Sequence, residues 1–297
     1  MDEYNSCTLC PRSCKVNRNL GAGICCVSSE IKVARAALHY WEEPCISGTN
    51  GSGAVFFSGC PLHCVFCQNE AISWGRQGTN ITEDRLADIF IELQEQGASN
   101  INLVTGTHYA PGIRAAVSLA RDRGLVIPTI YNCGGYESLD SVRQLKDTID
   151  VYLPDFKYWD AETAMKYSHT PNYVEVAQQS IAEMVRQKPS VKFDENGLVK
   201  EGVIVRVLLL PGHVNDAKNI VDYLYYTYKD SIYISLMSQF TPTDKLKDVP
   251  ELNRRVTKRE YNSLVDFALN IGVTNAFIQD RHVASESFIP EFDGTGV

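Results

Sequence analysis

Short apolar runs alternate with amphipathic stretches from about residue 54 onward, and this rhythm limits the folds that the chain can adopt. Repeated strand and helix units of this kind build a parallel sheet. Several runs are almost continuously apolar, which is typical of strands buried on both faces. The predicted strands are residues 54–58, 101–105, 127–132, 150–156, 203–210 and 232–237, with 276–279 as a candidate seventh.

Helical periodicity fills the segments between these strands. The first helix is expected to follow Thr82 as its N-cap and to stop near Gly97, with Leu86 and Leu93 among its apolar positions. The polar segment 188–201 reads as a loop with a short hairpin around residues 196–197. The predicted helices are residues 82–96, 111–123, 138–146, 174–187, 215–228 and 257–270. The simplest arrangement of these strands and helices is an open barrel of parallel strands.

The charge balance limits the partners that are expected. The net charge of −8 argues against binding nucleic acid or an anionic membrane through a basic face. No apolar run approaches the roughly 18 residues of a membrane span, and the acidic, polar start does not resemble a signal peptide. We therefore expect a cytoplasmic protein that binds neither nucleic acid nor membrane.

Ten cysteines are the most unusual part of the composition. The cytosol is reducing, and a chain of 297 residues does not need disulfides to fold, so metal ligation is the expected use of these thiols. Cys45 and Cys133 are expected to be buried, inert thiols. Seven of the ten fall into two tight groups, Cys7, Cys10, Cys14 with Cys25, and Cys60, Cys64, Cys67.

The second cysteine group follows directly on the first predicted strand, where parallel barrels place their ligand-binding loops. Cys60-x3-Cys64-x2-Cys67 can hold three corners of a four-iron, four-sulfur cubane, for which proteins usually supply four cysteines. The fourth iron is then left open, as in a catalytic metal site. The alternative is a zinc knot in which His63 or a distant residue supplies the fourth ligand.

This motif, with the aromatic Phe66 before its last cysteine, resembles the defining motif of the radical S-adenosylmethionine superfamily. Further segments are similar to homologues of pyruvate formate-lyase activating enzyme, and the similarity runs nearly the full length. These segments are residues 51–60, 64–69, 100–105, 152–158 and 235–239.

The resemblance implies an α/β fold, a partial (β/α)6 TIM-like barrel with a small N-terminal cysteine-rich, metal-binding cap. It divides the chain into a cysteine-rich region (1–50), a barrel (51–284) and a C-terminal tail (285–297). It also implies a [4Fe-4S] cluster whose open iron binds S-adenosylmethionine. One electron, from a low-potential donor such as flavodoxin or ferredoxin, cleaves that cofactor, and the resulting 5′-deoxyadenosyl radical abstracts hydrogen from a substrate.

Polar residues at the ends of successive predicted strands are the candidates for binding S-adenosylmethionine. The family usually carries a Gly-Gly-Glu motif after its second strand, whereas this chain has Thr-Gly-Thr-His at 105–108. Asp155 and Lys157 resemble an activating-enzyme segment, with a surface ion pair as the alternative. Arg206 also resembles a cofactor contact, with a structural pairing to a carboxylate as the alternative. The full candidate set is Thr105, Thr107, Asn132, Asp155, Lys157, Arg206 and Gln239, and none is assigned a catalytic role.

The N-terminal group supplies four thiolates for a closed site, which suits a second [4Fe-4S] cluster or a structural zinc. We favour the cluster, because such clusters relay electrons in related enzymes. Cys26 competes with Cys25 for the fourth position, and the spacing does not decide between them.

The leading functional hypothesis is a radical oxidoreductase of the activating-enzyme type, whose substrate is a protein backbone glycine. A small-molecule substrate is the first alternative. The second is an iron-sulfur electron carrier without catalysis, which the three-cysteine open site and the length of the barrel argue against.

Overall fold

The computed structural model describes residues 3–279 and 290–297. Within these residues the main sheet runs in the spatial order β10-β9-β8-β6-β5-β4-β2-β1-β3, and β7 pairs with β8. The strands are β1 (Ile31–His39), β2 (Ser52–Phe57), β3 (Thr79–Ile81), β4 (Ile101–Val104), β5 (Thr129–Cys133), β6 (Val151–Pro154), β7 (Lys192–Phe193), β8 (Val199–Leu208), β9 (Tyr233–Met237) and β10 (Ala276–Ile278).

Strands β2, β4, β5, β6, β8, β9 and β10 run parallel to one another, and their order in space follows their order in the chain. Every strand predicted from the sequence overlaps one of these. The fold is therefore a mixed α/β structure with a largely parallel sheet, consistent with a partial barrel. The carboxyl ends of these strands meet at one edge, where such folds bind ligands.

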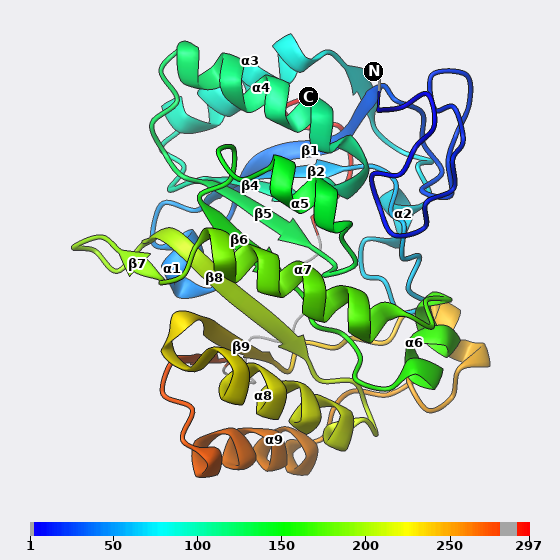
Figure 1. Cartoon of the computed structure of the whole chain (residues 1–297), viewed down its shortest axis with the longest axis vertical. Coiled ribbons are helices and arrows are strands. Elements are labelled where there is room, and N and C mark those ends of the chain that lie inside the picture. The colour runs from blue at the N-terminus through cyan, green and yellow to red at the C-terminus, as the bar shows by residue number, and fades with distance from the viewer. Residues whose placement is uncertain (1–2, 280–289) are drawn as a thin grey trace.

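Long helices connect the parallel strands, and Figure 1 shows α3, α4, α5, α7, α8 and α9 stacked along the sheet. All six predicted helices are present, and the Thr82 hydroxyl accepts a hydrogen bond from the backbone N–H of Arg85, as expected of an N-cap. The helices are α1 (Pro44–Ser47), α2 (Glu70–Ser73), α3 (Glu83–Glu95), α4 (Ala110–Asp122), α5 (Leu139–Gln144), α6 (Ala161–Ser168), α7 (Tyr173–Gln187), α8 (Val214–Tyr228) and α9 (Lys258–Ile271), with short 3-10 turns η1 (Thr107–Tyr109), η2 (Lys229–Ser231) and η3 (Asp244–Asp248).

The sheet begins before the barrel boundary that the sequence predicts at residue 51. Strand β1 pairs antiparallel with β2 and with β3, so part of the N-terminal region belongs to the main sheet. The expected hairpin is also present, because β7 pairs antiparallel with β8 and Gly197 has φ +76° in the connection.

The end of the chain returns to β1. Of the predicted tail, residues 285–289 lie outside the described residues. The N–H of Ala36 donates to the carbonyl of Thr295 at 2.9 Å, and Arg35 forms an ion pair with Asp293 at 2.9 Å. The last residues therefore pack along the strand that precedes the parallel sheet.

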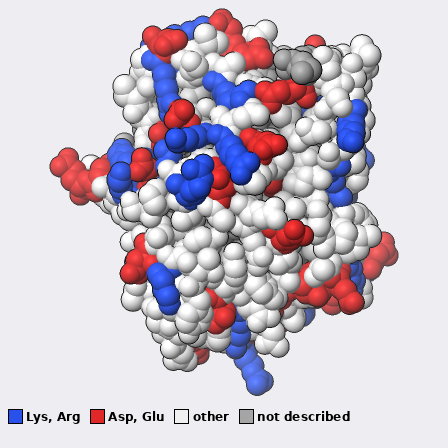
Figure 2. Space-filling view, viewed as in Figure 1, with Lys and Arg blue, Asp and Glu red and all other residues white. Residues whose placement is uncertain are grey.

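One face of the molecule carries charges of both signs. On the face seen in Figure 2, basic and acidic side chains are interspersed. No helix in the described parts of the chain is long and apolar enough to cross a membrane.

The N-terminal loops, dark blue in Figure 1, pack against the loop that follows β2. The N–H of Cys60 donates to the carbonyl of Cys25 at 3.2 Å, and the Arg12 Nε donates to the carbonyl of Pro61 at 2.9 Å. Gly59 has φ +87°, and a Cβ built there would lie 2.7 Å from the Cys25 carbonyl oxygen. Only glycine allows the two segments to approach this closely.

Gly59→Ala is therefore expected to be more destabilising than Gly97→Ala, a matched control with φ +90° and no atom within 4 Å of its built Cβ. The control should lose roughly 1–2 kcal/mol of unfolding free energy from its backbone conformation alone. The clash with Cys25 should add about 1–3 kcal/mol. Urea unfolding of the metal-free proteins measures both, and equal losses would contradict the close packing of these segments.

Candidate active site

A large cavity opens at the carboxyl edge of the parallel strands. It contains about 1340 Å³ of empty space, part of which is continuous with solvent. This is enough for a ligand of cofactor size. The three cysteines of the second group, Cys60, Cys64 and Cys67, line it. All seven candidate cofactor residues line it as well, namely Thr105, Thr107, Asn132, Asp155, Lys157, Arg206 and Gln239.

The cysteine loop follows β2 directly, so the end of a buried strand fixes its position. All three cysteines are free thiols. The Ser168 hydroxyl donates to the Cys64 sulfur at 3.0 Å, and the N–H of Leu62 donates to the Cys60 sulfur at 3.4 Å. Burial, with a smaller effect of the neighbouring Cys64, raises the pKa of Cys60 to about 11 and that of Cys67 to about 12. Metal binding at this loop must therefore displace protons.

The donor set fits an iron-sulfur cluster. Within the described residues, no three His, Cys, Asp or Glu side chains are placed so that they could hold one metal ion. In a cubane each cysteine binds its own iron, so its ligands do not have to meet at a single ion. Three soft thiols on one cavity wall suit that arrangement.

His63 does not join the cysteines in the cavity wall. Its ring stacks on Trp74 with centroids 4.0 Å apart, and its Nε2 lies 2.9 Å from the carbonyl of Ile24. The zinc knot with His63 as the fourth ligand is therefore not the arrangement in this structure.

Asp155 and Lys157 form an ion pair inside the cavity, directly after β6. Burial alone lowers the pKa of Lys157, but the Asp155 carboxylate and the thiols of Cys64 and Cys67 raise it above its ordinary value. The lysine therefore stays protonated next to the cysteine loop. The surface-pair alternative for these two residues is wrong, because their side chains are only 22% and 14% exposed and face the cavity.

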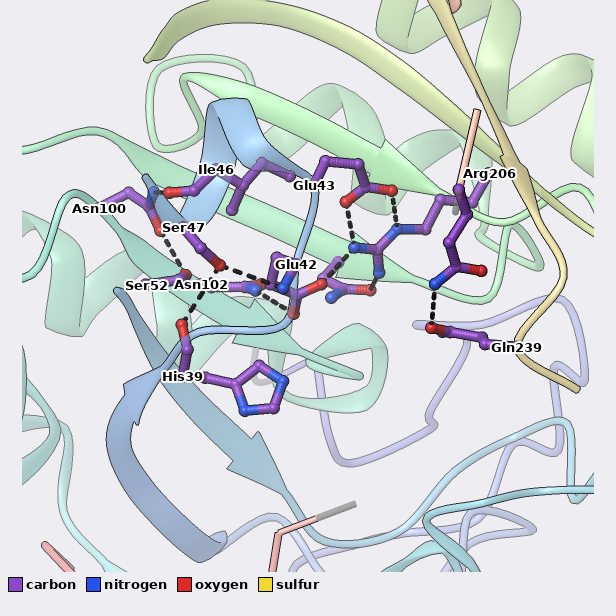
Figure 3. Close-up of polar contacts among 12 residues, drawn as sticks. His39, Glu42, Glu43, Ile46, Ser47, Ser52, Asn100, Asn102, Arg206 and Gln239 are labelled. Atoms are coloured by element: carbon purple, nitrogen blue, oxygen red, sulfur yellow. Dashed lines mark hydrogen bonds and ion pairs between the residues drawn. The ribbon is translucent and has the colours of Figure 1, made fainter. Parts of the chain in front are cut away.

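Arg206 projects from β8 into a carboxylate pair that the sequence reading missed (Figure 3). Its Nε and Nη2 donate to Glu43 at 2.8 and 2.5 Å, and Nη2 also donates to Glu42. Burial alone raises the pKa of Glu43, but the guanidinium lowers it below its ordinary range. The structural pairing that was the alternative for Arg206 is therefore present, and the role in cofactor binding stays a prediction.

Glu42 is held from several sides and lines the cavity. Its side chain accepts a hydrogen bond from Asn102 Nδ2 at 2.8 Å, and its own N–H donates to Ser47 Oγ at 3.1 Å (Figure 3). Two glutamates share one arginine, so this corner of the cavity carries a net negative charge. Glu42 and Glu43 lie just before the short helix α1, which begins with Pro44. Nothing in the sequence indicated that they would lie at the barrel cavity.

Glu137 is a second carboxyl group that the sequence reading missed. It lines the cavity four residues after β5 and accepts hydrogen bonds from Thr107 Oγ1 and Tyr131 OH, each at 2.9 Å. Burial raises its pKa to about 7. The loop at 105–108 lacks the carboxylate of the family motif, and the structure brings this one beside Thr107. The sequence did contain a signal for this residue, because Glu137 follows Gly134 and Gly135 at the end of a predicted strand.

The remaining candidates, Thr105, Asn132 and Gln239, lie in the cavity wall at the ends of neighbouring strands. Thr105 has φ +61°, and its N–H donates to the carbonyl of Asn132 at 2.8 Å. The Gln239 Oε1 accepts a hydrogen bond from Gln279 Nε2 at 2.8 Å (Figure 3). These residues reach the cavity, and their contacts with a cofactor stay predictions.

The structure also places the remaining histidine and cysteines that the sequence analysis named. His108 is buried, its Nε2 hydrogen-bonds the carbonyl of Ser58 at 2.8 Å, and burial lowers its pKa to about 3. It is a hydrogen-bonding residue of the loop after β4. Cys45 and Cys133 are buried, and Cys133 also lines the cavity. The N-terminal cysteines do not line it.

Arg206→Met should lower the free energy of unfolding by about 3–5 kcal/mol, because it leaves buried Glu43 without its counter-charge. The double variant Arg206→Met/Glu43→Gln should recover a large part of this loss. Urea unfolding of the metal-free proteins near neutral pH provides the measurement. A loss below about 1 kcal/mol in the single variant would mean that this ion pair does not stabilise the fold.

Comparison with known proteins identifies the family. The model of the Radical SAM superfamily matches residues 54–224, more than half of the chain. A protein of Methanocaldococcus jannaschii, "Uncharacterized protein MJ0674", is 27% identical over 273 residues, which covers 89% of this chain and 75% of that protein.

Two solved structures share the fold. The FeFe-hydrogenase maturase HydG from Carboxydothermus hydrogenoformans has a TM-score of 0.51 at 12% identity, covering 80% of this chain and 56% of that one. Streptococcus suis SuiB bound to S-adenosylmethionine has a TM-score of 0.50 at 12% identity, covering 77% and 52%. This chain thus spans about half the length of both. The family model, the cysteine loop and the cavity agree, and the chain belongs to the radical S-adenosylmethionine superfamily.

Proposed function

We propose that this chain cleaves S-adenosylmethionine reductively and abstracts hydrogen from a substrate bound in the cavity. The observation that supports this most is the convergence of Cys60, Cys64 and Cys67 with seven polar residues from five strand ends on one cavity. Members of this superfamily use a [4Fe-4S] cluster and S-adenosylmethionine, and the reduced cluster supplies the electron that yields the 5′-deoxyadenosyl radical.

In this proposal the three cysteines hold three irons and leave the fourth free for the cofactor. Lys157 is protonated beside the thiolates and reduces their mutual repulsion. Asp155 holds Lys157 in place and presents a carboxylate to the cavity. Glu137 offers a further carboxyl group next to Thr107, suited to an ammonium group such as that of the cofactor.

The first candidate substrate is a protein backbone glycine, as in activating enzymes. The similarity of residues 51–60 and 64–69 to that family supports it. The finer fold assignment, a partial (β/α)6 barrel with an N-terminal cysteine-rich cap, belongs to the same proposal. The sequence places the cap at residues 1–50 and the barrel at 51–284, but β1 (Ile31–His39) pairs with β2, so the proposed cap ends before β1.

A small molecule with a cationic group is the second candidate, and the cavity's charges favour it. Glu42 and Glu137 both line the cavity, and no lysine or arginine pairs with Glu137 in the described residues. If Glu137 binds the ammonium group of the cofactor, Glu42, which shares Arg206 with Glu43, is the carboxylate that a cationic substrate would meet, whereas a backbone glycine is uncharged.

Anaerobic protein, reconstituted with iron and sulfide and reduced with dithionite, should release 5′-deoxyadenosine from S-adenosylmethionine. The variant Cys60→Ala/Cys64→Ala/Cys67→Ala should release none, because it cannot hold the catalytic cluster. Liquid chromatography quantifies the product. Equal release by both proteins, or none by the iron-loaded parent, would contradict the proposal.

The substrate class can be tested by isotope transfer. Extract from cells grown in deuterated medium is separated by ultrafiltration into protein and small-molecule fractions, and each is added to the reduced enzyme with unlabelled cofactor. A protein substrate should place deuterium in 5′-deoxyadenosine only with the retained fraction. Deuterium transfer from the filtrate alone would overturn the activating-enzyme assignment and favour the small-molecule candidate.

A further inference from the structure

Arg18 is a fully buried guanidinium that pairs with no carboxylate in the described residues. Its Nε and Nη2 donate to the carbonyls of Val27 and Ser28 at 3.2 and 2.5 Å, and its Nη1 donates to the carbonyl of His108 at 2.5 Å. These acceptors are neutral, and a buried charge without a counter-charge is strongly unfavourable. Arg18 also lies over the rings of Tyr4 and Tyr109, 5.1 and 5.5 Å from their centroids. These contacts offset part of the cost of burial, and an anion nearby would offset the rest.

Thiols flank the polar contacts of Arg18, together with the phenol rings of Tyr4 and Tyr109. The Cys7 sulfur lies 3.9 Å from Arg18 Nη1. A Cβ built on Gly23 would be 3.4 Å from Arg18 Cδ, 3.4 Å from the Cys14 sulfur and 3.5 Å from the Cys25 sulfur. The absent side chain of Gly23 thus leaves a space that the arginine and two sulfurs surround.

Cys10 completes this group. It is 8% exposed and lies in the same loop, where the N–H of Ser13 donates to the Cys10 carbonyl and the N–H of Lys15 donates to the Cys7 carbonyl, each at 3.0 Å. All of these cysteines are free thiols in the structure. The sulfurs of Cys7, Cys14 and Cys25 thus lie beside one buried cation, and the same loop region, without helix or strand, carries Cys10.

The structure also distinguishes Cys25 from its neighbour. Cys25 is 5% exposed and faces the group through Gly23. Cys26 has φ +65°, is only partly buried, and its sulfur lies 3.8 Å from His63 Nε2. The sulfur of Cys26 therefore faces His63 rather than the space beside Gly23.

We propose that Cys7, Cys10, Cys14 and Cys25 hold a second [4Fe-4S] cluster and that Arg18 is its built-in counter-charge. Four thiolates give such a cluster a net negative charge, which matches the unpaired guanidinium. Each cysteine binds a different iron, so the four sulfurs do not have to meet at one ion. Thiolate ligation also explains why a region without regular secondary structure keeps three buried cysteines and a fourth, Cys14, that is partly buried.

The second cluster would lie next to the catalytic cysteine loop. The carbonyl of its ligand Cys25 accepts the hydrogen bond from the N–H of Cys60, so one hydrogen bond joins a ligand of each cluster. This path suits transfer of one electron from a low-potential donor of the flavodoxin or ferredoxin type. The second cluster is then oxidised as the first is reduced, with no bond broken. This relay role, unlike the cluster itself, rests on the proposed function.

Iron and sulfide counts test the cluster without any assay of activity. The reconstituted parent should contain about eight irons per chain, two cubanes of four each. The variant Cys60→Ala/Cys64→Ala/Cys67→Ala should retain about four, because its N-terminal region is unchanged. Retention of iron by this variant supports the proposal even if the parent fails to cleave S-adenosylmethionine.

Two single variants test the ligand assignment in the background of that triple variant. Cys25→Ala should lose most of the remaining iron, and Cys26→Ala should keep it. A triple variant that binds one zinc, or no metal, would overturn the second cluster. Loss of iron in Cys26→Ala with retention in Cys25→Ala would overturn the choice of Cys25.

Arg18→Lys and Arg18→Gln, in the same background, test the counter-charge. The lysine keeps the charge, whereas the glutamine keeps hydrogen-bond donors for the carbonyls. The glutamine variant should lose cluster or show a more negative midpoint potential by electron paramagnetic resonance titration, because the reduced cluster carries one more negative charge. The lysine variant should stay closer to the parent. Equal iron content and potential in the parent and the glutamine variant would overturn the role of Arg18.

Discussion

The candidate site depends on one constraint, the parallel direction of neighbouring strands in the sheet. Strands β2, β4, β5, β6, β8 and β9 point the same way and follow one another in space, so the residues after each strand meet at one edge. Cys60 and Gln239 are far apart in the sequence, yet both line the cavity at this edge. The chemistry of the family needs several groups around one cofactor, and this topology supplies them.

Burial explains how the charged groups of the cavity are paired, because a buried charge needs a partner of opposite charge. Arg206 is shared by Glu42 and Glu43, and Lys157 is paired with Asp155, so each buried cation has an anionic neighbour. Glu137 instead has hydroxyl donors, and burial raises its pKa to about 7. Carboxyl groups thus outnumber cations on the cavity wall. A ligand that brings positive charge, as S-adenosylmethionine does, is suited to such a wall.

Local patterns were sufficient to predict the parallel strands, the long helices and the cysteine loop, because each depends on residues close together in sequence. The contacts that cross the sheet were not predictable in this way. Glu42 and Glu43 reach Arg206 across more than 160 residues, and Glu137 meets Thr107 only because β4 and β5 are neighbours. Strand β1 was missed because it pairs antiparallel, outside the repeated strand and helix units. Arg18 carried no motif, and only its burial without a carboxylate singled it out.

The central claim is that the loop of Cys60, Cys64 and Cys67 holds a cluster with one iron free for S-adenosylmethionine. The most direct measurement is electron paramagnetic resonance of the dithionite-reduced protein, in a background that lacks the N-terminal cysteines, before and after the cofactor is added. The account predicts a [4Fe-4S]⁺ signal whose g values shift when S-adenosylmethionine binds. A signal that saturating cofactor leaves unchanged would contradict it.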